Sequence, residues 1–504
     1  MAGFKDAVRS AIKVNFRRIP QRLHDFLSTI LPISIVFLTG YMKFYFKGNE
    51  KIQCISYSAT KEAVNYYIPI VKFHGVETGD PTLAVVKNVF RLLGFRSATA
   101  STAVWDVLWS HTYPFHALDK ELTSLKSYQK VNHFPGTGFV TQKSNLAKLS
   151  VKSVPISFTL PSERESFLSY AEKNTGTFWL MKRRDHRGIH ILNGTENLSK
   201  NGSFVQEFIR NPFVINKKKF DIGVYVLITS IDPLRVYIYS GDILLRFCTE
   251  DYHPLNINSV SSYVVGDNYL PIWKVPDLKF YYSELNYTAK ESLNAYVQSK
   301  GKSYRRMWTQ IHAAVRDVYF KAEEPMKKLA MRLGRLRNYF ELVRFDFVAD
   351  ENLNVYLLEV NMSPNLSPAH FPQNKLLYEQ IVFNSLSLGG LVRKFPVLAA
   401  YRGEVEVSEK DIQVFIEQCA SEICQTSCKN LKCKVCSQCL NKEWKDIIKT
   451  AYLEHMNRGK YRRAIPAAIS SRQQIQNTAE PSEMNLVMDL WFKGKCLQDE
   501  AWCQ

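Results

Sequence analysis

The chain has 504 residues, of which 46% are hydrophobic and 13% aromatic, and it carries a formal net charge of +19. This length predicts two or three domains rather than one, and the apolar content excludes a disordered protein. The charge favours a polyanionic partner such as nucleic acid, an anionic membrane or an acidic protein tail, but no nucleic-acid-binding motif accompanies it, so we expect no nucleic acid partner.

The N-terminal part of the chain contains a candidate membrane anchor. A basic segment, residues 1–25, precedes residues 26–42 (FLSTILPISIVFLTGYM), the one uncharged run of this length in the sequence. The run contains Pro32 and is short for a bilayer span, which takes ~20 residues, so a buried or interfacial helix is the alternative. We expect an uncleaved transmembrane helix in a single-pass membrane protein, with the N-terminus in the cytoplasm because most flanking basic residues precede the run.

Two regions follow the candidate anchor. In the first, residues 54–150, the sequence YYIPIVKFHG (66–75) is typical of a strand, and the apolar spacing in DPTLAVVKNVFRLLGF (80–95) predicts a helix closed by Gly94. The second region, residues 151–400, is rich in short β-prone segments and contains a long helical pattern over 303–336. Its predicted β segments are 157–161, 177–185, 188–193, 203–209, 219–230 and 234–248, with turns at SIDP (230–233) and at SGD (240–242).

Residues 340–364 (FELVRFDFVADENLNVYLLEVNMSP) are predicted to form a β-hairpin with acidic groups at one end. Pairing around Asn352 places Asp346 nearly opposite Glu359, and Asn361 shares the face of Glu359. Two carboxylates and an amide are the oxygen donors that Mg²⁺ prefers, and the ion would relieve the repulsion between the acids. The alternative is a hairpin whose polar end lies in water.

Basic residues close several of the strands that precede the hairpin. Lys182 ends an apolar strand and is followed by a loop with Gly188, an arrangement in which backbone N–H groups and a lysine can bind phosphates. Lys219 and Asp221 alternate on one face of the next long strand, and Arg246 closes the strand after it. Each of these residues alone fits a solvent-exposed strand end equally well.

A short segment between these cations combines backbone, amide and apolar groups, as an adenine pocket requires. The edge of a core strand is the equal alternative for this segment. Its residues are Gln206, Glu207, Phe208 and Ile209.

Residues 401–504 form a Cys-rich C-terminal region that is expected to be helical. Ser408 is suited to cap a helix with Asp411 in its first turn. Six Asn-x-Ser/Thr sequons elsewhere in the chain add weight to a body that faces a lumen. The even number and close spacing of the cysteines favour disulfides in an oxidising compartment, with zinc as the alternative in a reducing one. Eight of the ten cysteines lie here: Cys419, Cys424, Cys428, Cys433, Cys436, Cys439, Cys496 and Cys503.

Taken together, several segments between about residues 70 and 395 resemble the tubulin–tyrosine ligase-like family of ATP-grasp enzymes. The resemblance implies an α+β, ATP-grasp-like fold with antiparallel-rich sheets, to which the transmembrane helix and the Cys-rich tail would be additions. The segments that carry it are WDVLWS (105–110), VNHFPG (131–136), FVQEFI, KKKFD, YVLITSIDPLRVYIY, LLRF, FELVRFDF and LLEVNMSP.

The resemblance implies an ATP- and Mg²⁺-dependent ligase, most similar to the polyglutamylases, that joins free glutamate to tubulin or another acidic protein tail through an acyl phosphate. It further implies a role for each candidate residue. These roles are ATP phosphate binding for Lys182, adenine binding for Gln206, Glu207, Phe208 and Ile209, nucleotide and substrate contact for Lys219 and Asp221, catalysis by Asp221 and Arg246, and magnesium binding by Asp346, Glu359 and Asn361.

Two departures from the family pattern favour a second hypothesis. Gly223 stands where the family motif KFDxR has its arginine, and the loop 258–271 (NSVSSYVVGDNYLP) does not match the family's sequence there. Arg184 or Arg344 are the neighbours that could replace the lost cation. The alternative function is therefore a catalytically degenerate scaffold that binds nucleotide or acidic tails. A cytosolic body would be associated with the cytoskeleton or a cilium, whereas a lumenal body would need an acceptor other than tubulin.

Overall fold

The structure, a computed structural model, describes two short stretches near the N-terminus and most of the chain from residue 68 onward. The described residues are 36–38, 41–43 and 68–504, apart from 78, 100–103, 184–187, 193–197, 200–201, 335, 393–406 and 469–481. The chain divides into two compact units, Met1–Val64 and Asn65–Gln504, which are described separately.

The predicted transmembrane segment, residues 26–42, lies mostly outside the described residues. Its described part belongs to two short strands, β1 (Val36–Leu38) and β2 (Tyr41–Lys43), which pair in antiparallel fashion. Among the residues that the structure describes, no helix has the length and apolar character needed to cross a bilayer. The prediction of a single-pass membrane protein is therefore wrong. A short apolar run containing β-branched residues satisfies strand pairing as readily as a helix.

The second unit begins with a small parallel sheet in the order β4-β3-β5-β6. The strand predicted at 66–75 is present as β3, and the predicted helix is present as α3, preceded by a turn that Asp80 caps. Gly94 follows α3 with a φ of 81°, a left-handed conformation that glycine adopts without steric cost. The strands of this sheet are β3 (Ile70–His74), β4 (Arg96–Ser97), β5 (Val107–Ser110) and β6 (Lys130–Val131).

A second sheet is antiparallel, and it contains the strands with Lys182 and Gln206. Its order is β7-β10-β8-β9, and Phe204 of β10 lies opposite Lys182 of β8. Helix α7 (Arg164–Lys173) packs on this sheet through Phe167, which contacts Trp179. The strands are β7 (Ser157–Leu160), β8 (Trp179–Arg183), β9 (His190–Ile191) and β10 (Ser203–Glu207).

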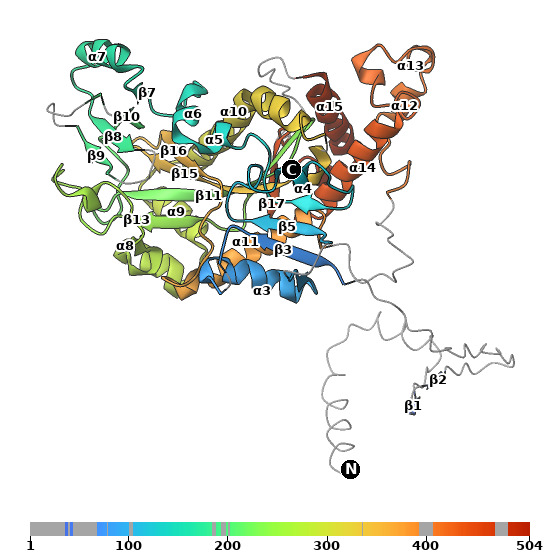
Figure 1. Cartoon of the computed structure of the whole chain (residues 1–504), viewed down its shortest axis with the longest axis horizontal. Coiled ribbons are helices and arrows are strands. Elements are labelled where there is room, and N and C mark those ends of the chain that lie inside the picture. Colours follow the sequence, from blue (N-terminus) through green and yellow to red (C-terminus); the bar gives the residue numbers. More distant parts are fainter. Residues whose placement is uncertain are drawn as a thin grey trace, which may run out of the picture. The chain divides into compact units, whose positions relative to one another are not determined.

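The central sheet has seven strands, and its antiparallel pairs bring distant parts of the chain together. Its main path is β14-β13-β11-β12-β17, while β15 pairs with β11 and with β16. Figure 1 labels β11, β13, β15, β16 and β17 of this sheet. The long strand β11 therefore has β13 and β15 on its two sides at the end where Asp221 lies. The strands are β11 (Phe220–Ile231), β12 (Leu234–Tyr239), β13 (Leu244–Phe247), β14 (Leu270–Pro271), β15 (Glu341–Ala349), β16 (Val355–Asn361) and β17 (Tyr461–Ile465).

Helices cover both faces of the central sheet. Met307, Ile311 and Val315 recur at helical spacing along α10 (Tyr304–Met331) and share one apolar core with Val224 and Val343 of the sheet. On the opposite face, apolar residues of α11 (Lys375–Leu388) join Leu227 and Leu342. The paired residues Gly223 and Asp346 lie on this second face because they are an even number of positions from Leu227 and Leu342. The candidate site therefore occupies one end of the face that α11 covers.

The remaining helices connect these layers or belong to the C-terminal region. Of those before residue 400, the longest is α9 (Ala289–Ser299), which begins with a capping box between Thr288 and Glu291. The others before residue 400 are α3 (Ala84–Leu92), α4 (Asp119–Leu122), α5 (Gly138–Thr141), α6 (Lys143–Lys148) and α8 (Pro276–Lys279).

The Cys-rich region contributes both disulfides and a strand to the second unit. Strand β17 pairs with β12, so the region 401–504 completes the edge of the central sheet. Eight cysteines form four disulfides, which confirms the disulfide alternative over zinc; Cys54 lies outside the described residues, and Cys248 is buried and reduced. The helices are α12 (Ile416–Cys419), α13 (Glu422–Thr426), α14 (Lys442–Met456) and α15 (Glu483–Gln498). The disulfides are Cys419–Cys436, Cys424–Cys433, Cys428–Cys439 and Cys496–Cys503.

The prediction of a helix that starts at Ser408 is wrong. Ser408 and Asp411 do exchange the predicted cap hydrogen bonds, but the chain forms only a turn there, and the helix begins at Ile416. Phe415 has a φ of 49°, which interrupts a right-handed helix. Ile412 and Val414 are both buried, and their spacing of two fits an extended segment better than a helix.

Candidate active site

The predicted hairpin is present, and an irregularity in it decides which carboxylates meet. Asp346 pairs with Glu359, whereas the next residue, Phe347, pairs with Leu357. A regular register continued from the turn would place Asp346 opposite Leu358 and Glu359 on the other face. The bulge after Asp346 shifts the register by one residue and brings both acids to the face that carries the site.

Four hydrogen bonds hold the carboxylate of Asp346. Arg344 donates from Nε to Oδ1 at 2.6 Å and from Nη2 to Oδ2 at 2.9 Å. Arg246 Nη2 and Asn361 Nδ2 donate to the same Oδ2 at 2.8 and 2.9 Å. Side chains of the protein therefore already neutralise this acid, a role that the sequence had assigned to magnesium alone.

Arg246 of β13 links the acidic residues of two neighbouring strands, Asp221 of β11 and Asp346 of β15. Its Nε and Nη2 donate to the two oxygens of Asp221, each at 2.9 Å, and Nη2 also reaches Asp346. Asp221 of β11 lies directly opposite Arg246 of β13 in the sheet register. This forked contact fixes the guanidinium in one orientation, as paired arginine–carboxylate hydrogen bonds do.

Glu359 is the second acidic group, and its main partner was not expected from the sequence. Lys143, at the start of α6, lies 2.8 Å from Glu359 Oε2, and Asn361 Nδ2 donates to Oε1 at 3.3 Å. Loss of contact with water would raise the pKa of Glu359, but the charges of Lys143, Lys182 and Arg246 lower it to about 2. Glu359 is therefore ionised at neutral pH and available to a cation.

Lys182 lies buried beside this acidic group. Its Nζ donates to Gln206 Oε1 at 2.5 Å, across the pair formed by β8 and β10. Burial, followed by the nearby charge of Lys143, lowers the pKa of Lys182 to about 7, while Glu359 acts in the opposite direction. Lys182 and Glu359 act on each other electrostatically, so the strand that carries Lys182 lies near the acidic end of the hairpin.

The segment predicted to contact adenine has a partly aromatic environment. Phe208 is buried, and its ring centroid lies 5.8 Å from that of Tyr263 and 6.4 Å from that of Tyr252. Lys219 is buried nearby and donates to the carbonyl of Tyr263 at 2.7 Å. The loop 248–269, which carries no recognisable motif, thus supplies the wall of this part of the site.

The structure brings most of the candidate residues together, but not all. Asp221, Arg246, Asp346, Glu359 and Asn361 form one hydrogen-bonded network. Lys182 lies beside it, and the charge of Lys219 contributes to the lowering of the pKa of Lys182. The others lie at its margin: Glu207 and Ile209 are half-buried, and Gly188 is exposed with a φ of 68°. Residues 184–187, including Arg184, lie outside the described residues.

Sequence reasoning missed Lys143, Tyr252 and Tyr263. Lys143 comes from a helix far from the hairpin in sequence and has no motif that would single it out. Arg344 was named only as a substitute cation, although its position two residues before Asp346 places both side chains on one face of β15. An arginine two residues before an aspartate on a largely apolar strand was the available signal.

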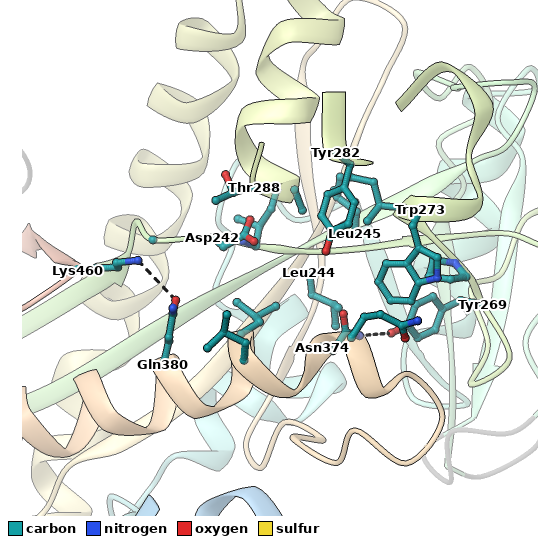
Figure 2. Close-up of a pocket in the computed structure, with 18 residues that line it drawn as sticks. Asp242, Leu244, Leu245, Tyr269, Trp273, Tyr282, Thr288, Asn374, Gln380 and Lys460 are labelled. Carbon is teal, nitrogen blue, oxygen red and sulfur yellow. Dashed lines mark hydrogen bonds between the residues drawn. The ribbon is translucent and has the colours of Figure 1, made fainter. Parts of the chain in front are cut away.

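A pocket of about 200 Å³ adjoins the network along β13. Figure 2 shows its aromatic wall, in which Tyr269 lies beside Asn374 and accepts a hydrogen bond from its amide at 3.1 Å. Burial raises the pKa of Asp242, which also lines the pocket, to about 6, although backbone N–H groups of Lys290 and Ile243 oppose the rise. The partly buried carboxylate of Asp242, at the N-terminus of α9, stabilises that helix and disfavours an acidic ligand in the pocket.

Metal binding at the network would have to use the hairpin donors. Among the described residues, no three His, Cys, Asp or Glu side chains gather as a metal-binding cluster. Asp346, Glu359 and Asn361 supply two carboxylates and one amide, a set whose chemistry fits Mg²⁺ when phosphates and water complete the coordination.

Comparison with known proteins gives a consistent result. The profile of the Tubulin-tyrosine ligase family matches residues 121–396. The chain is 36% identical over 487 residues to the protein named "Probable tubulin polyglutamylase ttll-15" of Caenorhabditis elegans, an alignment that covers 91% of this chain and 92% of that protein.

Mammalian relatives are similar over a little more than half of the chain. The similarity to "Tubulin monoglutamylase TTLL4" of Homo sapiens is 28% identity over 308 residues, or 57% of this chain and 25% of that protein. For "Tubulin polyglutamylase TTLL5" of Mus musculus it is 30% over 309 residues, or 56% and 22%. The chain thus spans about a quarter of the length of these two relatives, and nearly all of the nematode one.

Proposed function

The chain belongs to the tubulin–tyrosine ligase family, and on that premise we propose that it is an ATP-dependent ligase that joins glutamate to tubulin. The relatives reported above are named tubulin polyglutamylases or monoglutamylases, which supports glutamate as the amino acid and tubulin as the acceptor. The order of the sheets and the antiparallel central strands support an ATP-grasp arrangement, in which nucleotide binds between two sheets.

In this proposal the cations of the site bind the nucleotide. Lys182 and Lys219 are buried, and a lysine that has lost its water shell gains more from a phosphate partner than an exposed one does. Asp221 fixes the orientation of Arg246, so the N–H groups of Arg246 that do not bind Asp221 or Asp346 can donate to a phosphate. Phosphoryl transfer depends mainly on positioning and charge neutralisation, which these residues can supply without a protein nucleophile.

Magnesium fits this site through the side-chain oxygens of Glu359 and Asn361. Asp346 would add a third oxygen donor when one of its hydrogen bonds to Arg246 or Arg344 breaks. When bound with ATP, the ion would neutralise phosphate charge during transfer to a carboxylate of the acceptor. The residues' own contribution is to hold the nucleotide phosphates, keep Glu359 ionised and orient Arg246. Gln206 and Phe208 would border the adenine.

One observation carries the proposal: two sheets that are separate in sequence bring both Lys182 and Arg246 within electrostatic reach of Glu359. The alternative interpretation places these residues at separate strand ends in water, where their charges would not affect one another. The net positive charge of the chain also suits an acidic acceptor.

The proposal predicts that Glu359→Gln removes ligase activity. We expect at least about a 100-fold lower rate of labelled glutamate incorporation into tubulin with ATP and Mg²⁺, because a neutral amide cannot replace an ionised metal ligand. Glu351→Gln is the matched control, since Glu351 is exposed in the turn of the same hairpin. Incorporation that persists in Glu359→Gln, or that is lost equally in both variants, contradicts the assignment.

A second candidate function rests on the saturated carboxylate of Asp346. A site whose acid is already bonded to two arginines and an amide could bind nucleotide without transferring phosphate. Folded wild-type protein that binds an ATP analogue with Mg²⁺ but incorporates no glutamate into tubulin or into another acidic acceptor would select this scaffold function.

A further inference from the structure

The hydrogen bonds around Asp346 leave little of its carboxylate for a metal ion. An ionised carboxylate has about four lone-pair sites, and four donors from three side chains contact this one. Arg344 supplies two of the four, and both Arg344 and Asp346 are buried. Removing such a paired, buried charge from its partner is costly, so the contact is a stable feature of the site.

Gly223 explains how Arg344 comes to lie there. Gly223 is opposite Asp346 in the register of β11 and β15, and it has no side chain to occupy the space above the strand. A Cβ atom at position 223 would lie 2.9 Å from Cδ and 3.3 Å from Nε of Arg344, and 3.3 Å from Cβ of Leu244. Any side chain at 223 would therefore force Arg344 to move. The glycine that replaces the family's arginine makes room for an arginine from the next strand.

The charge balance of the site points in the same direction. Lys143, Arg246 and Arg344 already contact the three carboxylates, those of Asp221, Asp346 and Glu359, and the buried Lys182 and Lys219 add partial positive charge beside them. A free divalent cation approaching this group therefore meets no net negative charge that would attract it. Nucleotide phosphates reverse the balance because they bring several negative charges with them.

We propose that Arg344, seated over Gly223, is a positioning residue that keeps Asp346 from binding a free divalent cation, so that the metal ion enters only together with the nucleotide. The inference rests on the proposed function in that it assumes a nucleotide site here. Arg344 acts through Asp346. We therefore expect the protein to bind a divalent metal ion more tightly when nucleotide is present than when it is absent.

Manganese can serve as the probe, because free Mn²⁺ is counted directly by electron paramagnetic resonance. With the full chain and no nucleotide, we expect no Mn²⁺ bound at the site up to about 1 mM, a concentration at which a typical exposed protein oxygen site would begin to fill. With a non-hydrolysable ATP analogue, we expect one additional Mn²⁺ per chain, lost in Glu359→Gln.

Substitutions at the two positions test the role of Arg344. Arg344→Gln should increase the affinity for Mn²⁺ without nucleotide at least about tenfold, because it removes a positive charge next to the metal donors. Arg344→Lys retains the charge and should remain close to wild type. Gly223→Ala keeps every charged group but displaces Arg344, so it should also allow Mn²⁺ to bind, whereas Gly176→Ala, at an exposed glycine with open space around it, should not.

The double variant Gly223→Ala/Arg344→Gln shows whether Gly223 acts through Arg344. If it does, the double variant binds Mn²⁺ no more tightly than Arg344→Gln alone. Thermal unfolding of each variant identifies any that fail to fold, and Gly223→Ala and Arg344→Lys keep the test open if Arg344→Gln is one of them.

Two results would overturn the inference: wild-type protein that binds Mn²⁺ at this site without nucleotide, or an Mn²⁺ affinity that Arg344→Gln and Gly223→Ala leave unchanged or weaken. Failure of the proposed function gives a different result. In that case no folded variant binds the ATP analogue under any metal condition, while the nucleotide-free Mn²⁺ measurements still report on Arg344.

Discussion

Lys182 illustrates how one side chain acquires a property that its sequence context does not reveal. A lysine at the end of an apolar strand is ordinarily solvated, yet here it is buried and donates to Gln206. Burial favours the neutral amine and lowers the pKa of Lys182 to about 7, with Lys143 adding to the effect. A phosphate group in contact with Lys182 would favour the charged form instead. The protonation of this lysine and the binding of nucleotide are therefore coupled.

We expect nucleotide binding to take up a proton at about pH 8. Above pH 7 the lysine of the free protein is largely neutral and must become protonated when phosphate binds, so affinity should fall as pH rises, by up to roughly tenfold per unit. Below pH 7 the lysine is already charged and the affinity should level off. Calorimetry in two buffers with different ionisation heats measures the uptake.

The control for this measurement is Lys182→Arg, whose guanidinium stays charged throughout the range. Its nucleotide binding should show no proton uptake assignable to position 182. An uptake of the same size in wild type and in Lys182→Arg would show that another group titrates.

At the scale of elements, the hairpin and the C-terminal helices are held to the central sheet by specific buried contacts. The bulge in β15 and β16 sets which acids face the site, as described above. Farther along the sheet, Glu454 of α14 accepts hydrogen bonds from Arg235 at 2.8 and 3.0 Å and from the hydroxyl of Tyr237 at 2.9 Å. Thr229 of β11 also donates to Glu454. This cluster joins the Cys-rich region to the sheet that carries the site.

Glu454→Ala should therefore destabilise the fold by about 3–5 kcal/mol, because it leaves the guanidinium of Arg235 buried without a counter-charge. Urea unfolding followed by tryptophan fluorescence measures the change. Glu443→Ala, on the exposed side of the same helix, is the control and should change stability by no more than about 0.5 kcal/mol. Equal stability of the two variants would mean that the buried cluster does not hold α14 on the sheet.

At the scale of the whole molecule, the charge of +19 is the property most relevant to the acceptor. A field of this size speeds the approach of an acidic protein tail and strengthens its binding at low salt. Surface charges are screened by ions, whereas the buried cations that face the nucleotide are screened much less. Acceptor binding and nucleotide binding should therefore respond differently to salt.

We expect the affinity for a glutamate-rich acceptor peptide to fall roughly tenfold between about 50 and about 300 mM salt, with a smaller change in the affinity for an ATP analogue. Fluorescence anisotropy with a labelled peptide measures the first and calorimetry the second. A peptide of the same length with glutamine in place of glutamate should bind weakly at both salt concentrations. Salt-independent binding of the acidic peptide would exclude the positive surface as its docking site.

The sequence was sufficient for the local structure and for the types of residue in the site. Apolar periodicity located β11, β12 and β13 of the central sheet and the long helix α10, and the run from Phe340 to Pro364 predicted both a hairpin and its acidic end, whereas β14 and β17 were not predicted. These features depend on neighbours along the chain, whose spacing the sequence states directly. The uncharged run at residues 26–42 and the turn at Ser408 show the limit, since a short apolar or capping pattern is compatible with more than one local structure.

Only the tertiary structure decided which groups meet. The bulge after Asp346, the contact of Lys143 with Glu359, and the seating of Arg344 over Gly223 each depend on residues that are distant in sequence or on a register shift of one position. Burial, which sets the pKa of Lys182, likewise results from packing of the whole unit. The physical reason is that electrostatic partners are chosen by distance in space, and the chain's folding brings together charges whose sequence positions carry no sign of that proximity.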